Sequence, residues 1–233
     1  MTINIIRNGK KATFKVVQND ETLLQVLTEI KTTQDASLSF ASGCRSSVCG
    51  SCAMRVNGKE VLACAYKPES GDIIEPLKNV PLIRDLVVDV QKALSFNKVA
   101  KAWAVSPEVL PSVSPEQAEV NEVQSDCILC GACYSACPVY AVNPEFIGPF
   151  ALTRNWRYVS DVREADIAGK IDAVQTNGVW DCTLCGECVP VCPQGIAPKS
   201  DIDMLRNKSN VLGYMDPKYA NFGGGLDFGA PSF

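Results

Sequence analysis

The twelve cysteines of this chain constrain it more than any other feature, because they fall into three groups of four with fixed spacing. Two groups repeat the run CxxCxxCxxxCP, and the group nearest the N-terminus is spaced CxxxxCxxC with a fourth cysteine further on. In chain order the groups are Cys44, Cys49, Cys52 and Cys64; Cys127, Cys130, Cys133 and Cys137; Cys182, Cys185, Cys188 and Cys192. Four cysteine thiolates ligate one iron–sulfur cluster, so the sequence predicts three clusters and therefore a path for electrons.

Disulfides and zinc are the two other common uses of so many cysteines. Disulfides indicate an exported protein, and the sequence shows no export signal. Paired CxxC runs also bind zinc, but zinc sites do not need the third and fourth cysteines of a CxxCxxxCP run. The spacing therefore favours iron–sulfur ligation over both alternatives.

Composition narrows the function further. The 233 residues carry a formal net charge of −4, so no basic surface indicates nucleic-acid binding. The chain contains no histidine, which excludes Ser-His-Asp and Cys-His catalysis, histidine-ligated zinc and Rieske centres. We therefore expect no catalytic residues and no bond-making substrate chemistry in this chain alone.

The N-terminal group has the spacing of plant-type ferredoxins, which bind a 2Fe–2S cluster. Its loop is rich in glycine and serine, small residues that let the backbone approach a cluster closely. Backbone N–H groups of such a loop can point at the cluster sulfurs. These properties predict a 2Fe–2S cluster on Cys44, Cys49, Cys52 and Cys64.

The two repeated runs are expected to exchange one ligand each. In two-cluster ferredoxins the first three cysteines of a run bind one cluster and the fourth binds the other. This rule predicts a 4Fe–4S cluster on Cys127, Cys130, Cys133 and Cys192. The third cluster then takes Cys137, Cys182 and Cys188, with Cys185 available as a fourth ligand. Such an exchange joins the two runs into one domain across the 44 residues between them.

The first hundred residues alternate apolar and polar positions in a way that predicts strands around one helix. An Asn-Gly turn at residues 8–9 separates two such stretches, which is a hairpin signal. Thr22 is expected to cap a helix whose apolar positions run from Leu23 to Ile30. Further strands are expected over residues 54–56, 61–64 and 72–75. A sheet crossed by one helix predicts a β-grasp domain.

The second half of the chain reads as helices joined by short loops. Residues 82–95 have apolar positions at helical spacing, and a proline-rich stretch follows as a linker. Further helices are expected before Cys127, over residues 150–157 and 167–177, and after Pro198. The tail, residues 213–233, is expected to be mobile or docked on a partner.

The predicted fold class is therefore α+β. We expect a β-grasp plant-type 2Fe–2S ferredoxin domain over residues 1–97. An all-α bacterial-type two-cluster ferredoxin domain is expected to follow over residues 98–233.

Four stretches of the sequence resemble the iron–sulfur subunits of succinate dehydrogenases and fumarate reductases. They are SGCRSSVCGSCAMRVNG, PLIRDLVVDV, CPVYAVNPEFIGPFAL and NGVWDCTLCGECVPVCP. The last two are most similar to the fumarate reductase branch, and the likeness extends to about residue 205.

This resemblance implies an electron-transfer subunit of a succinate:quinone oxidoreductase. It implies a flavoprotein partner that carries FAD, a membrane anchor, and a quinone reached through that anchor. Electrons would pass through the 2Fe–2S cluster, the 4Fe–4S cluster and the third cluster in that order. FAD is expected on the partner and not on this chain.

One position departs from the family pattern. The family's third cluster is usually 3Fe–4S, with a residue other than cysteine at the fourth position, where this chain has Cys185. A thiolate there can hold a fourth iron, so we expect a second 4Fe–4S cluster, with 3Fe–4S as the alternative. The opposite interpretation is that Cys185 points away from the cluster as a buried hydrophobic residue.

The quinone end of the path also departs from the family. No histidine is available to contact a quinone, and Tyr140 is either a quinone contact or a packed aromatic residue. The resemblance therefore makes an anchor of an unorthodox type plausible.

Two other functions compete with this interpretation. The runner-up is the iron–sulfur subunit of a thiol-linked fumarate reductase or heterodisulfide-reductase-like complex, and the third is a freely diffusing ferredoxin. The sequence shows no leader and no run of apolar residues that spans a bilayer. We therefore expect peripheral attachment at the cytoplasmic face of the cytoplasmic membrane, or at the periplasmic face if a partner carries the chain across.

Overall fold

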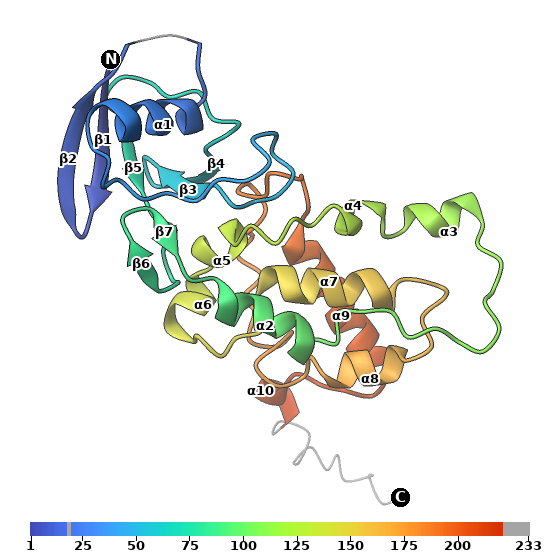
Figure 1. The fold of residues 1–233 in the computed structure, drawn as a ribbon. Helices are drawn as coiled ribbons and strands as arrows, with labels where there is room; N and C mark the ends of the chain where they lie inside the picture. The colour runs from blue at the N-terminus through green and yellow to red at the C-terminus, as the bar shows by residue number, and fades with distance from the viewer. Residues whose placement is uncertain (18–19, 221–233) are drawn as a thin grey trace, which may run out of the picture.

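The computed structural model describes residues 1–17 and 20–220, which form two packed units (Figure 1). The first unit contains a five-stranded mixed sheet in the order β2-β1-β5-β3-β4 and a separate two-stranded hairpin. Its elements are β1 (Thr2–Arg7), β2 (Lys10–Lys15), α1 (Leu23–Thr33), β3 (Ala53–Val56), β4 (Lys59–Leu62), β5 (Ile73–Glu75), β6 (Leu82–Arg84) and β7 (Val87–Val88). The sheet and α1 enclose the first hydrophobic core.

The predicted N-terminal hairpin and helix cap are confirmed. Asn8 and Gly9 adopt left-handed φ angles of 49° and 75°, and β1 pairs antiparallel with β2. Thr22 caps α1 through a capping box: its hydroxyl accepts from Gln25 N at 3.4 Å, and Gln25 Oε1 accepts from Thr22 N at 2.8 Å. β1 pairs in parallel with β5, and β3 joins β5 to β4 in antiparallel pairs.

The helix predicted over residues 82–95 is wrong in its first half. There β6 and β7 form a hairpin, and α2 begins only at Gln91. The turn residue Asp85 is buried, and its carboxylate accepts from Arg7 Nε at 3.0 Å and from Ser39 N at 2.8 Å. These bonds come from residues distant in sequence, so apolar spacing alone cannot reveal the turn that they fix.

The second unit is built around α7, which packs against α2, α4, α8 and α9 (Figure 1). The helices are α2 (Gln91–Val99), α3 (Pro115–Glu119), α4 (Glu122–Ser125), α5 (Ala132–Ser135), α6 (Pro138–Val142), α7 (Pro149–Val159), α8 (Ile167–Asp172), α9 (Pro198–Val211) and α10 (Pro217–Ala220). The described regular elements after Val88 are helices. Residues 221–233, most of the predicted tail, lie outside the described residues, so an all-α second domain stays a prediction.

Most of the predicted helices appear in this unit. Those expected before Cys127, near 150–157 and after Pro198 are confirmed as α3 with α4, α7 and α9. The helix expected over 167–177 is shorter, because α8 ends at Asp172. The buried residues of α2 pack in the second core, and the domain boundary at residue 97 stays a prediction.

Gly148 allows the start of α7 to pass close to a buried tyrosine. Its φ is 87°, and a Cβ at this position would lie 2.2 Å from the Tyr134 ring. The Tyr134 ring cannot retreat, because its centroid lies 4.8 Å from that of Tyr140 and 4.5 Å from that of Phe150. The side chain is also fully buried.

We expect Gly148→Ala to destabilise the protein by about 2–5 kcal/mol, because it combines overpacking with backbone strain. Gly71→Ala is the matched control: Gly71 also has a positive φ, 99°, but open space where its Cβ would lie. That control is expected to cost about 1 kcal/mol. Thermal unfolding of both variants measures the difference, and equal losses would contradict the role assigned to Tyr134.

Candidate functional site

The loop of the first cysteine group turns backbone N–H groups toward sulfur atoms. Ser46 N and Val48 N both donate to Cys44 Sγ, at 3.4 and 3.3 Å. Donors directed at a sulfur stabilise its thiolate form, and here they lower the pKa of Cys44 to about 6. The backbone donors of the loop therefore favour the thiolate form of Cys44, the form that binds metal.

The other three thiols of this group lie beside Cys44. Cys44 N donates to Cys49 Sγ at 3.3 Å, and Ser47 N donates to Cys64 Sγ at 3.3 Å. Burial raises the pKa of Cys52 to about 11, and the neighbouring thiols of Cys64 and Cys49 add to the effect. The structure thus brings together the four cysteines that the sequence predicted for the 2Fe–2S cluster.

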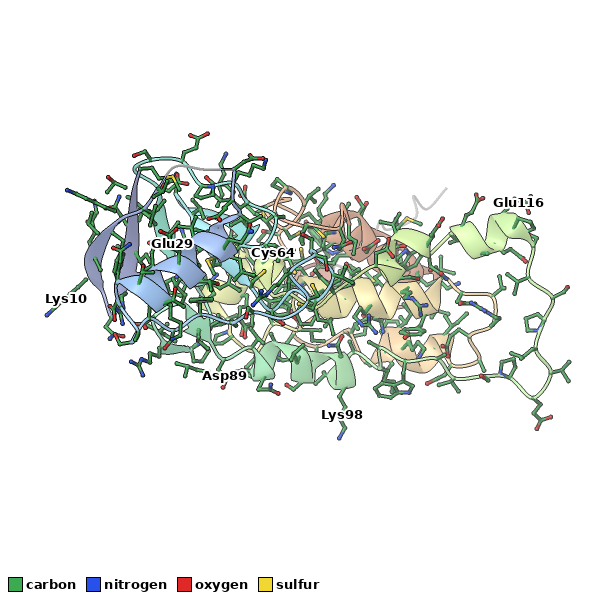
Figure 2. All side chains as sticks on the ribbon, turned by 45° about the horizontal axis from the view of Figure 1, so that its top comes forward. Lys10, Glu29, Cys64, Asp89, Lys98 and Glu116 are labelled. Atoms are coloured by element: carbon green, nitrogen blue, oxygen red, sulfur yellow. The ribbon has the colours of Figure 1, made fainter. Side chains whose placement is uncertain are left out.

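Unusual backbone conformations shape this loop. Arg45 and Ser47 adopt left-handed φ angles of 62° and 61°, which residues other than glycine seldom adopt. A Cβ on Gly43 would lie 2.8 Å from Cys49 Sγ, so the close approach of backbone to sulfur requires glycine there. Cys64 lies at the end of the first unit that faces the second (Figure 2).

The eight remaining cysteines line two cavities, and each cavity takes thiols from both repeated runs. The thiols of the first cavity belong to Cys127, Cys130, Cys133 and Cys192. Those of the second belong to Cys137, Cys182, Cys185 and Cys188. Across residues 1–17 and 20–220 no three cysteine or acidic side chains converge closely enough to hold a single metal ion. The fourth cysteine of each run therefore lies with the first three of the other, around an open volume.

The donors of the two cavities fit iron–sulfur clusters. Burial raises the pKa of Cys130 to about 11 and that of Cys188 to about 12. A buried thiol loses its proton readily only when nearby positive charge stabilises the thiolate. Iron supplies that charge, and thiolate sulfur is the ligand that iron–sulfur clusters use.

The repeated runs share the same left-handed turn at their second cysteine. Leu129 and Leu184 occupy matching positions with φ angles of 56° and 55°, and Gly131 and Gly186 follow with 80° and 87°. Two left-handed residues in each run turn the loop back on itself, so that Leu184 N donates to Cys182 Sγ at 3.4 Å. The sequence repeat is therefore also a structural repeat at this turn, although helices α5 and α6 follow it in the first run only.

Helices α7 and α9 form a common wall behind both cavities. Phe150 and Thr153 of α7 line the first cavity, and α9 contributes Pro198 to the first and Ile202 to the second. These two helices pack against each other. The apolar side chains keep water away from the thiols on that side.

The first cysteine group touches the first cavity directly. Gly50 lies so close to Cys130 that a Cβ on the glycine would be 2.7 Å from Cys130 Cβ. Gln194, two residues beyond Cys192, donates from Nε2 to the Ser47 carbonyl at 3.0 Å. The first thiol set therefore adjoins the second. Cys188 of the third set lies near enough to Cys133 of the second to add to the rise in the Cys133 pKa that burial causes.

Known proteins share this organisation. Residues 5–95 match a 2Fe-2S iron-sulfur cluster binding domain, and residues 123–196 match a 4Fe-4S dicluster domain. The chain is 40% identical over 197 residues to the fumarate reductase iron-sulfur subunit of Mycobacterium tuberculosis, with 79% of each chain covered. It is 37% identical over 232 residues to that of Haemophilus influenzae, covering 89% of this chain and 90% of the relative. The chain belongs to the family of fumarate reductase and succinate dehydrogenase iron–sulfur subunits.

The fold of this iron–sulfur subunit also has a solved counterpart. A chain of the Mycobacterium smegmatis Sdh1 complex in the apo form matches it with a TM-score of 0.81, 23% identity, and coverage of 92% of this chain and 97% of that chain. The chain thus has a ferredoxin-like 2Fe–2S domain followed by a 4Fe–4S domain, in a family that carries three clusters. Within the described ranges, no helix combines the length and the apolar character that crossing a membrane requires.

Cys185, the residue at which this iron–sulfur subunit departs from its family pattern, stands on the wall of the second cavity. Its side chain is exposed, so it is not a buried hydrophobic residue. It shares the cavity with the three expected ligands, Cys137, Cys182 and Cys188. Its position is compatible with ligation, which stays a prediction.

Tyr140 is a packed aromatic residue within this chain, and a contact with quinone stays a prediction. Its ring is buried and lies edge-on to that of Tyr134.

Asn79 holds the backbone of residues 134–137 in place, and the sequence did not predict this role. Its Nδ2 donates to the carbonyl oxygens of Tyr134, Ser135 and Cys137, at 3.2, 2.8 and 3.3 Å. No motif or spacing marks Asn79 in the sequence.

A second residue missed from the sequence is Asp201, which lies behind the first cavity on α9. Burial raises the pKa of its carboxyl to about 6. Gln124 Nε2 and Thr153 Oγ1 each donate to it at 2.8 Å, which opposes that shift. Because Thr153 lines the first cavity, only the Thr153 side chain separates the Asp201 carboxylate from that thiol-lined cavity. In the sequence, Asp201 looks like an ordinary acidic residue in the first turn of a helix, where negative charge is favourable.

Proposed function

We propose that this iron–sulfur subunit carries electrons between an FAD-bearing flavoprotein subunit and a membrane anchor with its quinone, within a succinate:quinone oxidoreductase. When bound, iron–sulfur clusters accept and release single electrons. The observation that carries the proposal is the closeness of successive thiol sets: Gly50, on the loop of the first set, lies against Cys130 of the second, and Cys188 of the third set lies near Cys133 of the second.

We propose the following ligand sets. The 2Fe–2S cluster binds Cys44, Cys49, Cys52 and Cys64; the 4Fe–4S cluster binds Cys127, Cys130, Cys133 and Cys192; the third cluster binds Cys137, Cys182, Cys185 and Cys188. The backbone donors around the first set and the thiol lining of the two cavities support these assignments.

The residues of the chain would hold the clusters, keep water away from them and set the distance between them. Backbone N–H groups of Ser46 and Val48 offset negative charge at Cys44. Phe150 and Ile202 exclude water from the two cavities. The small Gly50 keeps the first and second sets close, because any larger side chain would push Cys130 away.

The third set favours a 4Fe–4S cluster over a 3Fe–4S cluster. A cubane with four irons is commonly held by one cysteine for each iron, and four thiols line the second cavity. An additional thiolate also adds negative charge, which lowers the potential of the cluster. We therefore propose a final electron partner that works at a lower potential than the usual quinone.

Partners and location complete the proposal. The complex that we propose includes the flavoprotein and an anchor of an unorthodox type, and it is attached peripherally at the cytoplasmic face of the cytoplasmic membrane. The periplasmic face is the alternative. The exposed Val142 on α6, five residues beyond Cys137, offers apolar surface beside the third set.

The second candidate is the iron–sulfur subunit of a thiol-linked fumarate reductase or heterodisulfide-reductase-like complex. The observation that favours it is the exposed Cys185 beside the third set. In the direction of fumarate reduction, the two candidates differ in the electron donor that the complex accepts, a quinol in the first and a thiol in the second.

Purification from native membranes tests the proposed function. We expect the chain to co-elute with an FAD-containing subunit, and succinate to reduce both an artificial dye and the iron–sulfur clusters of the complex. Fumarate reduction driven by thiols and not by quinols would select the second candidate. A soluble, cluster-bearing monomer that binds no flavoprotein would contradict both.

Replacement of Cys185 tests the third cluster. In the wild-type complex we expect no strong EPR signal from an oxidised 3Fe–4S cluster, because the fourth thiolate retains the fourth iron. Cys185→Ala should create that signal at about one spin per complex, since it leaves three cysteine ligands. Thr183→Ala is the matched control, because Thr183 lines the same cavity without a thiol. A strong oxidised 3Fe–4S signal in intact wild-type material would contradict the assignment.

A further inference from the structure

One hydrogen bond connects the loop after Cys192 to the first cysteine group. Gln194 Nε2 donates to the Ser47 carbonyl oxygen at 3.0 Å, although the two residues are 147 positions apart in the sequence. Gln194 also lines the first cavity, together with Cys192. A single side chain therefore reaches from the second thiol set to the first.

The peptide group that accepts this hydrogen bond also donates one to a thiol. The Ser47 carbonyl and the Val48 N–H belong to the same peptide unit, and Val48 N donates to Cys44 Sγ at 3.3 Å. The path Gln194–Ser47–Val48–Cys44 is thus a chain of two hydrogen bonds through one amide plane. It starts two residues from Cys192 and ends on the sulfur of Cys44.

The two hydrogen bonds of such a chain strengthen each other. A donor at a carbonyl oxygen polarises the peptide group, so that the N–H on its other side becomes a stronger donor. A stronger N–H bond to Cys44 Sγ stabilises negative charge on that sulfur. Reduction adds negative charge to an iron–sulfur cluster, and hydrogen bonds to its sulfurs therefore raise its reduction potential.

A second contact makes the geometry firm. Gly50, on the same loop as Ser47, lies against Cys130. The first and second thiol sets are therefore held at two points, Gly50–Cys130 and Gln194–Ser47. Gln194 can then act on Ser47 without displacing the whole loop. Its neutral amide suits this place, because a carboxylate would face the Ser47 carbonyl oxygen without a proton to donate.

We propose that Gln194 is a positioning residue that raises the reduction potential of the first cluster and couples that cluster to the second. This inference rests on the proposed function, because it requires clusters on the first and second thiol sets. Gln194 acts through the Ser47–Val48 peptide group and touches no substrate.

A redox titration of the purified complex, followed by EPR with chemical mediators, tests this proposal. We expect Gln194→Ala to shift the electron equilibrium between the first and second clusters about twofold to fivefold away from the first cluster. For a one-electron couple this equals a fall of about 20–40 mV in the first potential. Gln194→Glu should lower it further, because it removes the donor and adds a negative charge.

Gln34→Ala is the matched control. Gln34 Nε2 also donates to a backbone carbonyl, that of Lys15 at 2.8 Å, so the variant removes the same kind of bond. Gln34 follows the C-terminal end of α1, whereas the N-terminal part of that helix faces Arg45 and Cys64. The control is expected to leave the first potential unchanged.

The spin–spin interaction between the reduced first and second clusters is the second readout. In Gln194→Ala we expect weaker relaxation enhancement of the first cluster's EPR signal, with iron and sulfide contents unchanged. Potentials equal to wild type in both Gln194 variants would overturn the proposal. Loss of the first cluster in both variants would also overturn it, because it would assign Gln194 a purely structural role. The mediators need no succinate, so a complex that succinate fails to reduce contradicts the proposed function and not this inference.

Discussion

The exchange of one cysteine between the repeated runs is the constraint on which the second unit depends. Cys137 lies with the thiols of the later run, and Cys192 lies with those of the earlier run. Neither cavity takes all four of its thiols from one run, so the 44 residues between the runs are held at both ends. The intervening α7 is then placed against α9, and these two helices back both cavities.

Burial of the thiols links folding of this unit to its cofactors. Desolvation raises the pKa values of the partly buried Cys130 and the buried Cys188 to about 11 and about 12. Thiolates at these positions need positive charge beside them, so iron binding and folding are expected to stabilise each other. The first unit depends less on this coupling, since its sheet has a hydrophobic core of its own. Gly50 and Gln194 join the two units at the point where the first thiol set meets the second.

The features that were predicted correctly are those that a local sequence pattern encodes. Cysteine spacing predicted how the thiols are divided between the two cavities, and the Asn-Gly turn at residues 8–9 predicted the first hairpin. The turn at Asp85 was missed because Arg7 and Ser39, both distant in sequence, hold it. Gln194 was missed for the same reason: its partner Ser47 lies 147 positions away, and nothing in a glutamine after a Cys-Pro pair signals that contact.

The crossed ligand sets are the central claim, and one measurement tests them most directly. In a Cys185→Ala background we expect the third cluster to carry the oxidised 3Fe–4S EPR signal, which would identify it. Adding Cys192→Ser should leave that signal intact while the signal of the middle 4Fe–4S cluster disappears; adding Cys137→Ser should instead abolish the 3Fe–4S signal. A Cys192→Ser variant that keeps its middle cluster and loses the 3Fe–4S signal would contradict the exchange.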